Sequence, residues 1–147
     1  MTEENIKYFY DEMWAKHQMN PVHRLAHEQH SHVIKEMFSQ REVGRTLVIG
    51  TGKGKDLYYV LPLTSNLIAT DISESGLSLI SLDVNKCCCD ANFLPFQDET
   101  FDFVLICEVL EHIIDPSNVV EEIYRVLVRG GGNTRYDSEL EVLVWFN

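Results

Sequence analysis

Three glycines at regular spacing form the first feature with chemical meaning. The short β-branched run 46–49 ends in Gly50-Thr51-Gly52-Lys53-Gly54, and a helical pattern follows. A strand, a tight glycine turn and a helix start let a ligand approach backbone N–H groups closely. A P-loop would need glycine in place of Ile49 and Ser or Thr in place of Asp56, and a dinucleotide fingerprint would need glycine in place of Lys55. The loop alone therefore predicts a ligand site without identifying the ligand.

Acidic residues follow the next two predicted strands. Asp71 ends the run 66–70 and lies 21 residues after Gly50, and Asp90 follows the weaker run 84–88. A carboxylate at the carboxyl edge of a sheet, beside a glycine loop, can accept hydrogen bonds from ribose hydroxyls. Asp71 could also be a helix cap and Asp90 a turn residue. Ligand-type groups at three successive strand ends favour a binding site.

The elements that must position these groups alternate between strand and helix. Apolar strands are predicted at 46–49, 66–70, 84–88 and 101–107, with helices at about 55–61, 73–81 and 108–128. Strands that are apolar throughout and alternate with helices predict a doubly wound parallel sheet, covered on both faces. Two helices are predicted before it, over 4–17 and from Pro21 to Gly44, and 139–146 can form one further strand.

Composition limits the classes of partner. The chain has 147 residues, which fits one domain, and a net charge of −11. Residues 56–124 carry thirteen acidic side chains and one basic side chain, Lys86, which disfavours a nucleic-acid backbone as partner. No apolar run approaches the roughly 18 residues of a membrane span, and the acidic start is unlike a secretory signal. We therefore expect a cytoplasmic protein that binds neither nucleic acid nor membrane.

The cysteines and histidines do not predict a metal centre. The triplet 87–89 and Cys107 contain no CxxC hook, which favours small buried thiols in a reducing compartment. His23, His27 and His30 share one helix face, but zinc sites of this kind usually add a remote ligand. A polar helix face is the favoured interpretation of these histidines.

Two long stretches resemble a known family. Residues 90–104 (DANFLPFQDETFDFV) and 109–116 (VLEHIIDP) resemble the "D-A-x-x-L-P-F … F-D-x-V … V-L-E-H-x-x-D-P" pattern of class I S-adenosylmethionine-dependent methyltransferases of the small-molecule type. Residues 121–127 with Gly130 and Gly131 resemble the family's "E-x-x-R-V-L-K-P-G-G". The resemblance covers about residues 45–131. It implies an α/β, Rossmann-like, doubly wound and mostly parallel sheet, with 1–44 as a helical cap and 45–147 as the cofactor-binding domain of one structural unit.

The resemblance also implies a cofactor, S-adenosyl-L-methionine, and a set of contacts. The glycine loop would wrap the methionine part, Asp71 would bind the ribose, and Asp90 would bind the adenine amino group. Ile72, with Phe93 or Leu94, would flank the adenine, and the end of the fourth strand would lie under the sulfonium. The implied contacts follow four strands: Gly50, Thr51, Gly52, Gly54, Asp71, Ile72, Asp90, Ala91, Asn92, Cys107 and Glu108.

The resemblance implies methyl transfer to a small-molecule acceptor. His112 and Glu108 are the candidate bases, because both follow the fourth strand near the expected methyl group. Each could instead be an ordinary surface or packing residue. Tyr8, Tyr10 and Trp14 of the first helix could form a lid or simply pack against the sheet. The alternatives to an active enzyme are a cofactor-binding but catalytically incomplete protein, or an interaction subunit.

The chain departs from the family pattern in three places. Val48 stands where the family usually has an acid, the loop carries Lys53 and Lys55, and Val128-Arg129 replaces Lys-Pro. Family members also continue for three more strands, so we expect a truncated fold that lacks the C-terminal strands. Because a truncated sheet exposes an edge strand, a homodimer that covers this edge is a further expectation.

Overall fold

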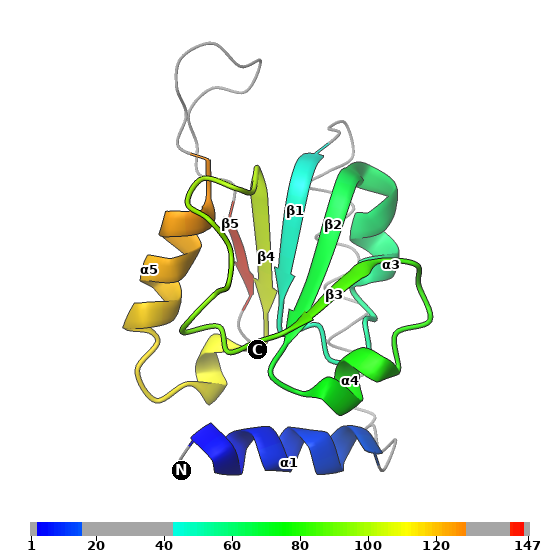
Figure 1. Ribbon diagram of the computed structural model, residues 1–147, viewed down its shortest axis with the longest axis vertical. Helices are drawn as coiled ribbons and strands as arrows, with labels where there is room; N and C mark the ends of the chain where they lie inside the picture. The colour runs from blue at the N-terminus through cyan, green and yellow to red at the C-terminus, as the bar shows by residue number, and fades with distance from the viewer. Residues whose placement is uncertain (1–2, 16–42, 129–141, 146–147) are drawn as a thin grey trace.

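A five-stranded sheet with helices on both faces forms the centre of the molecule (Figure 1). The computed structural model describes residues 3–15, 43–128 and 142–145. Its elements, in chain order, are α1 (Glu3–Ala15), β1 (Val43–Ile49), α3 (Leu57–Val60), η1 (Leu61–Leu63), β2 (Thr64–Asp71), α4 (Glu74–Ser78), β3 (Asn85–Cys88), β4 (Phe103–Cys107), η2 (Leu110–His112), α5 (Ser117–Val126) and β5 (Val142–Trp145).

The strand order is β3-β2-β1-β4-β5, and every pair is parallel. The predicted Rossmann-like sheet is therefore confirmed. The predicted strand within 139–146 is β5, which pairs with β4 from Val104↔Val142 to Cys107↔Trp145. The chain order reverses between β1 and β4, and in such sheets ligands bind outside the carboxyl ends of the strands at this switch point. The glycine loop and Glu108 follow the two strands that meet there.

Side chains of β1, β2 and β4 alternate between two separate cores. In β1, Leu47 and Ile49 enter one core and Val48 enters the other, so both faces of the strand are covered. The first core, against α3 and α4, contains Val43, Val48, Leu57, Val60, Leu67, Ala69, Leu77, Ile80, Phe103 and Leu105. The second core, against α5, contains Leu47, Ile49, Leu94, Phe101, Val104, Ile106, Val119, Ile123, Val126 and Leu127.

The helix predicted over 108–128 is two shorter elements, η2 and α5. Proline disfavours the helical region for the residue before it, so Asp115 lies between the two elements: η2 ends at His112 and α5 begins after Pro116. The helix predicted over 55–61 is α3, which continues into η1 with Pro62 at its start. The helix predicted over 73–81 is the shorter α4, which Ser73 caps by accepting a hydrogen bond from Gly76 N–H.

Gly44 does not end a helix as predicted. It lies within β1, where a Cβ atom would collide with the Asp102 side chain. That carboxylate accepts a hydrogen bond from the neighbouring Arg45 N–H at 2.7 Å. Glycine therefore provides space for a side chain that holds the amino end of the strand. The rest of the helix predicted from Pro21, with His23, His27 and His30, lies outside the described residues.

The cysteines are less buried than predicted. Cys87, Cys89 and Cys107 are half-buried and Cys88 is exposed, all as free thiols. The prediction of fully buried residues is wrong because β3 is an edge strand and Cys107 ends β4 at the carboxyl edge. Within the described ranges, no helix is both long enough and apolar enough to cross a membrane.

Candidate functional site at the carboxyl edge of the sheet

The glycine loop turns sharply away from the end of β1. Gly50, Gly52 and Gly54 have φ angles of +71°, +48° and +78°, a region that side-chain-bearing residues rarely adopt. Thr51 N–H donates to the Thr70 carbonyl at 3.0 Å, and Gly54 N–H donates to the Thr51 carbonyl at 2.8 Å. The spacing GxGxG therefore reflects three backbone positions that need glycine. The turn lies beside the end of β2.

Gly50→Ala should destabilise the protein by about 2 kcal/mol, measured by urea unfolding. A methyl group there would collide with the Val109 side chain and would also force alanine to a positive φ. In a Val109→Ala background, Gly50→Ala should cost less stability than it does in the unaltered protein. The collision is absent there, and only the backbone cost of about 1–2 kcal/mol remains. Equal costs in both backgrounds would contradict the predicted collision.

Asp71 is the most strongly held carboxylate at this edge. Its side chain accepts hydrogen bonds from Gly52 N–H at 2.6 Å and from Ser73 N–H at 2.8 Å. The residue is 8% exposed, and burial raises the pKa of its carboxyl group despite these two donors. The carboxylate is thus fixed in orientation and poorly hydrated, so any ligand donor that reaches it gains a strong hydrogen bond. Ile72 follows it and is half-buried.

Asp90 organises the turn after β3. Its Oδ1 accepts hydrogen bonds from Asn92 N–H at 2.8 Å and from the Asn92 amide group at 2.9 Å. Phe93 N–H donates to the Asp90 carbonyl at 3.1 Å. Leu94 is buried in the second core, whereas Phe93 is 67% exposed. Of the two side chains expected beside an adenine, Phe93 is therefore the one at the surface, and Ala91 lies half-buried between them and β3.

The end of β4 combines backbone strain with negative charge. Glu108 has a φ of +53°, which for a residue other than glycine often marks a functional site. Burial raises the pKa of the Cys107 thiol, and the nearby carboxylates of Asp56, Glu108 and Glu111 raise it further. These carboxylates come from three different segments, so the chain gathers negative charge around the end of β4.

Helix α1 lies beneath the carboxyl ends of the strands and alongside α4 (Figure 1). The rings of Tyr10 and His112 pack edge to face, with centroids 5.9 Å apart. Burial raises the pKa of Tyr10 to about 12, with the Asp71 and Glu111 carboxylates adding to the effect. Tyr8 is exposed and donates to Glu12 at 3.0 Å, and the Trp14 side chain lies outside the described part. Of the predicted lid residues, Tyr10 is the one that the structure brings to the site.

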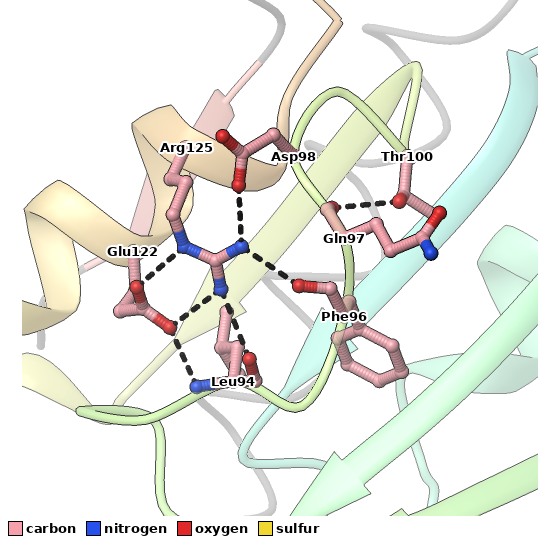
Figure 2. Close-up of polar contacts among 7 residues, drawn as sticks. All are labelled: Leu94, Phe96, Gln97, Asp98, Thr100, Glu122 and Arg125. Carbon is pink, nitrogen blue, oxygen red and sulfur yellow. Dashed lines mark hydrogen bonds and ion pairs between the residues drawn. The ribbon is translucent and has the colours of Figure 1, made fainter.

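Sequence reasoning missed the arginine clamp that joins α5 to the segment after Asp90 (Figure 2). Arg125 of α5 forms two hydrogen bonds with Glu122 at 2.7 and 2.8 Å, and donates to the carbonyl groups of Phe96 at 2.7 Å and Leu94 at 3.0 Å. It also contacts Asp98 at 2.9 Å, and Glu122 accepts a hydrogen bond from Leu94 N–H at 2.7 Å. The clamp fastens the segment after Asp90 to α5. The spacing E-x-x-R places the pair one turn apart, a signal that could have predicted the first of these contacts.

The predicted site residues therefore meet at one edge of the sheet. The glycine loop, Asp71, Asp90, Glu108 and His112 all follow the carboxyl ends of strands β1 to β4. Where the structure describes the chain, no group of three His, Cys, Asp or Glu side chains is arranged to hold a metal ion. The arrangement offers carboxylate acceptors, glycine backbone and an aromatic–histidine pair to an organic ligand.

Comparisons with known proteins agree with this fold. Residues 47–132 match the family described as "Methyltransferase domain". The chain is 33% identical over 135 residues to the protein MJ0638 of Methanocaldococcus jannaschii, which covers 87% of this chain and 58% of that protein. It is 27% identical to a demethylmenaquinone methyltransferase of Oceanobacillus iheyensis, over 88% of this chain and 60% of the relative. The chain thus spans somewhat more than half the length of these relatives.

A solved structure shares the same architecture. It contains a methyltransferase of Haloferax volcanii in complex with the Trm112 methyltransferase activator. The superposition has a TM-score of 0.66 at 23% identity and covers 83% of this chain and 57% of that chain. At this identity the likeness concerns the fold alone.

Proposed function

Because the chain belongs to the class I S-adenosylmethionine-dependent methyltransferase family, we propose that its carboxyl-edge site binds S-adenosylmethionine and transfers the methyl group to a small molecule. Asp71 is the observation that carries the proposal. It is a desolvated carboxylate at the end of β2, held by Gly52 of the glycine loop. A ligand with two vicinal hydroxyl donors satisfies such a group, as in dinucleotide sites.

The other residues at the edge fit the same cofactor. Asp90 would accept a hydrogen bond from the adenine amino group, with Ile72 and Phe93 beside the ring. The carboxylates of Asp56, Glu108 and Glu111, each of which acts electrostatically on Cys107, suit a ligand with cationic groups. Val48 occupies the position where the family usually has an acid in the first strand, so these carboxylates would have to supply the negative charge for the cofactor's amino group. When bound, S-adenosylmethionine would supply a methyl group on a sulfonium cation.

The chain's own residues would orient the acceptor and take its proton. His112 lies after β4 and is exposed, so its ring is accessible to an acceptor. Tyr10 packs on that ring and restricts its orientation. His112 would accept a proton from an oxygen, nitrogen or carbon acid, with Glu108 as the second candidate. Helix α1 would exclude water from the reacting atoms.

A small acceptor is supported by charge and by the named relative. The net charge of −11 and the carboxylates at the site oppose binding of a phosphate backbone. The relative from Oceanobacillus iheyensis is named for methylation of demethylmenaquinone, a small molecule. We extend that class of acceptor, without the specific compound, to this chain.

Calorimetry followed by a transfer assay tests the proposal. We expect S-adenosylmethionine to bind, and radioactive methyl label to pass to at least one member of a panel of phenols and quinols. His112→Ala and His112→Phe should both bind the cofactor normally but lower turnover by about 100-fold, a typical contribution of a general base. Phenylalanine preserves the ring contact with Tyr10, so full activity of His112→Phe would show that packing, not proton transfer, matters. Absence of cofactor binding would refute the whole proposal.

A partner-dependent protein is the second candidate. The Haloferax volcanii methyltransferase was solved together with an activator protein, which gives this alternative a concrete precedent in the same fold. A chain that binds the cofactor but lacks a complete acceptor site would behave in this way. Cofactor binding without turnover on any acceptor, followed by turnover when a second protein is added, would favour this candidate over the first.

A further inference from the structure

A continuous chain of hydrogen bonds links α1 to the glycine loop. The Ser73 hydroxyl donates to Asp11 of α1 at 2.6 Å, and Ser73 N–H donates to Asp71 at 2.8 Å. The other oxygen of Asp71 accepts a hydrogen bond from Gly52 N–H at 2.6 Å. Four residues from four segments are therefore joined by three short contacts.

Asp11 determines how Ser73 is oriented. A hydroxyl group has one proton to donate, and Ser73 directs it to Asp11 while its oxygen accepts a hydrogen bond from Gly76 N–H at 3.0 Å. Ser75 N–H also donates to Asp11, at 3.2 Å. The hydrogen bond from Ser73 lowers the pKa of the Asp11 carboxyl group, so Asp11 is the ionised acceptor at neutral pH. With its hydroxyl fixed on both sides, Ser73 presents its N–H to Asp71.

The two carboxylates also interact directly through their charges. The Asp11 charge contributes to raising the pKa of Asp71, after the larger effect of burial. Like charges that share one serine repel each other. Hydrogen-bond donors or cationic groups of a ligand at Asp71 would offset this repulsion. Occupation of the site and attachment of α1 should therefore favour each other.

We propose that Asp11 is a positioning residue for the cofactor, which acts through Ser73 and Asp71 to fix the glycine loop. This inference rests on the proposed function, because it assigns Asp71 to the cofactor. Asp11 is linked to the carboxylate of Asp71 through one intervening residue, Ser73, and touches no reacting atom. Tyr10, the preceding residue, contacts His112 on the other side of the edge, so α1 joins the β2 and β4 sides of the site.

Three variants separate the role of Asp11 from general effects of helix α1. Asp11→Ala removes both acceptor and charge, whereas Asp11→Asn keeps an acceptor oxygen of the same size. Glu12→Ala is the matched control, because Glu12 is the next acidic residue of α1 and accepts a hydrogen bond from the exposed Tyr8. Hydrogen exchange of the peptide covering residues 50–56 is measured without cofactor. Affinity for S-adenosylmethionine is then measured by calorimetry.

We expect Asp11→Ala to speed exchange in residues 50–56 by about fivefold and to weaken cofactor affinity about tenfold. Asp11→Asn should restore both values to within about threefold of the unaltered protein, and Glu12→Ala should change neither. Equal exchange in Asp11→Ala and Glu12→Ala would overturn the inference, as would faster exchange with unaltered affinity. Absence of cofactor binding by the unaltered protein would instead refute the proposed function. The exchange comparison distinguishes the two failures because it needs no cofactor.

Discussion

Asp71→Asn should reduce the affinity for S-adenosylmethionine by at least about 100-fold, as measured by calorimetry. The carboxylate accepts hydrogen bonds from Gly52 N–H and Ser73 N–H, and it would accept two more from the ribose. An asparagine amide has a single acceptor oxygen, so its NH₂ group would face a backbone donor. Each hydrogen bond to a charged group contributes about 1.5–3 kcal/mol, and 1.4 kcal/mol is tenfold in affinity.

Asp102→Asn is the matched control for this experiment. Asp102 also accepts a hydrogen bond from a backbone N–H, that of Arg45 at 2.7 Å, but it precedes β4 at the opposite edge of the sheet. Its substitution should leave cofactor affinity within about twofold, because it removes the same charge far from the site. Asp71→Glu, which keeps the charge, replaces Asp71→Asn in the comparison if the latter fails to fold. Its affinity for the cofactor should be lower than that of Asp102→Asn and higher than the value expected for Asp71→Asn. Equal affinities of Asp71→Asn and Asp102→Asn would show that the cofactor is bound elsewhere.

Arg125→Ala should lower the free energy of unfolding by about 2–3 kcal/mol in urea. The side chain is 31% exposed, and its substitution would remove the donors for the carbonyl groups of Leu94 and Phe96. It would also leave Glu122, whose pKa Arg125 holds below its ordinary value, without its cation. The contact with the exposed Asp98 should add little.

Arg45→Ala provides the comparison, since Arg45 forms an ion pair with Asp102 at 3.5 Å. Both of those side chains are about half exposed, at 50% and 41%. Such pairs contribute little, so this variant should lie within about 0.5 kcal/mol of the unaltered protein. Arg125→Lys should recover only part of the loss, because an ammonium group cannot reproduce the planar set of five donors. Equal effects of Arg125→Ala and Arg45→Ala would contradict the clamp.

Periodicity was sufficient to predict the sheet because the strands β1 and β4 at its middle are buried on both faces. The run 103–107 is apolar throughout, and it forms strand β4, which lies inside the sheet between β1 and β5. The doubly wound arrangement followed from the handedness of crossover connections, and Asp71 from its position at the end of the second predicted strand. The break at Pro116 was also present in the sequence, since the residue before a proline disfavours the helix. Because the apolar residues on both sides of Pro116 follow helical spacing, periodicity alone did not reveal the break.

Contacts between distant segments could not be predicted in this way. Asp11 is one acidic residue on an amphipathic helix, and its partner Ser73 lies 62 residues further along the chain. Nothing in the local pattern distinguishes Asp11 from Glu12, which accepts a hydrogen bond from Tyr8 of the same helix. The positive φ of Glu108 is similarly invisible, because glutamate, unlike glycine or asparagine, carries no signal for that conformation. Such features require knowledge of how the elements pack.

The division of the apolar side chains between two faces of the sheet has a consequence for combining substitutions. Val104 and Leu105 are neighbours in sequence, yet each belongs to a different core. Val104 instead shares its core with Val119, from a helix that follows. Free-energy changes add for sites without shared partners and deviate for sites that share a cavity. Distance along the sequence is therefore a poor predictor of which substitutions have non-additive effects in this protein. The face of the sheet to which each side chain belongs is the better predictor.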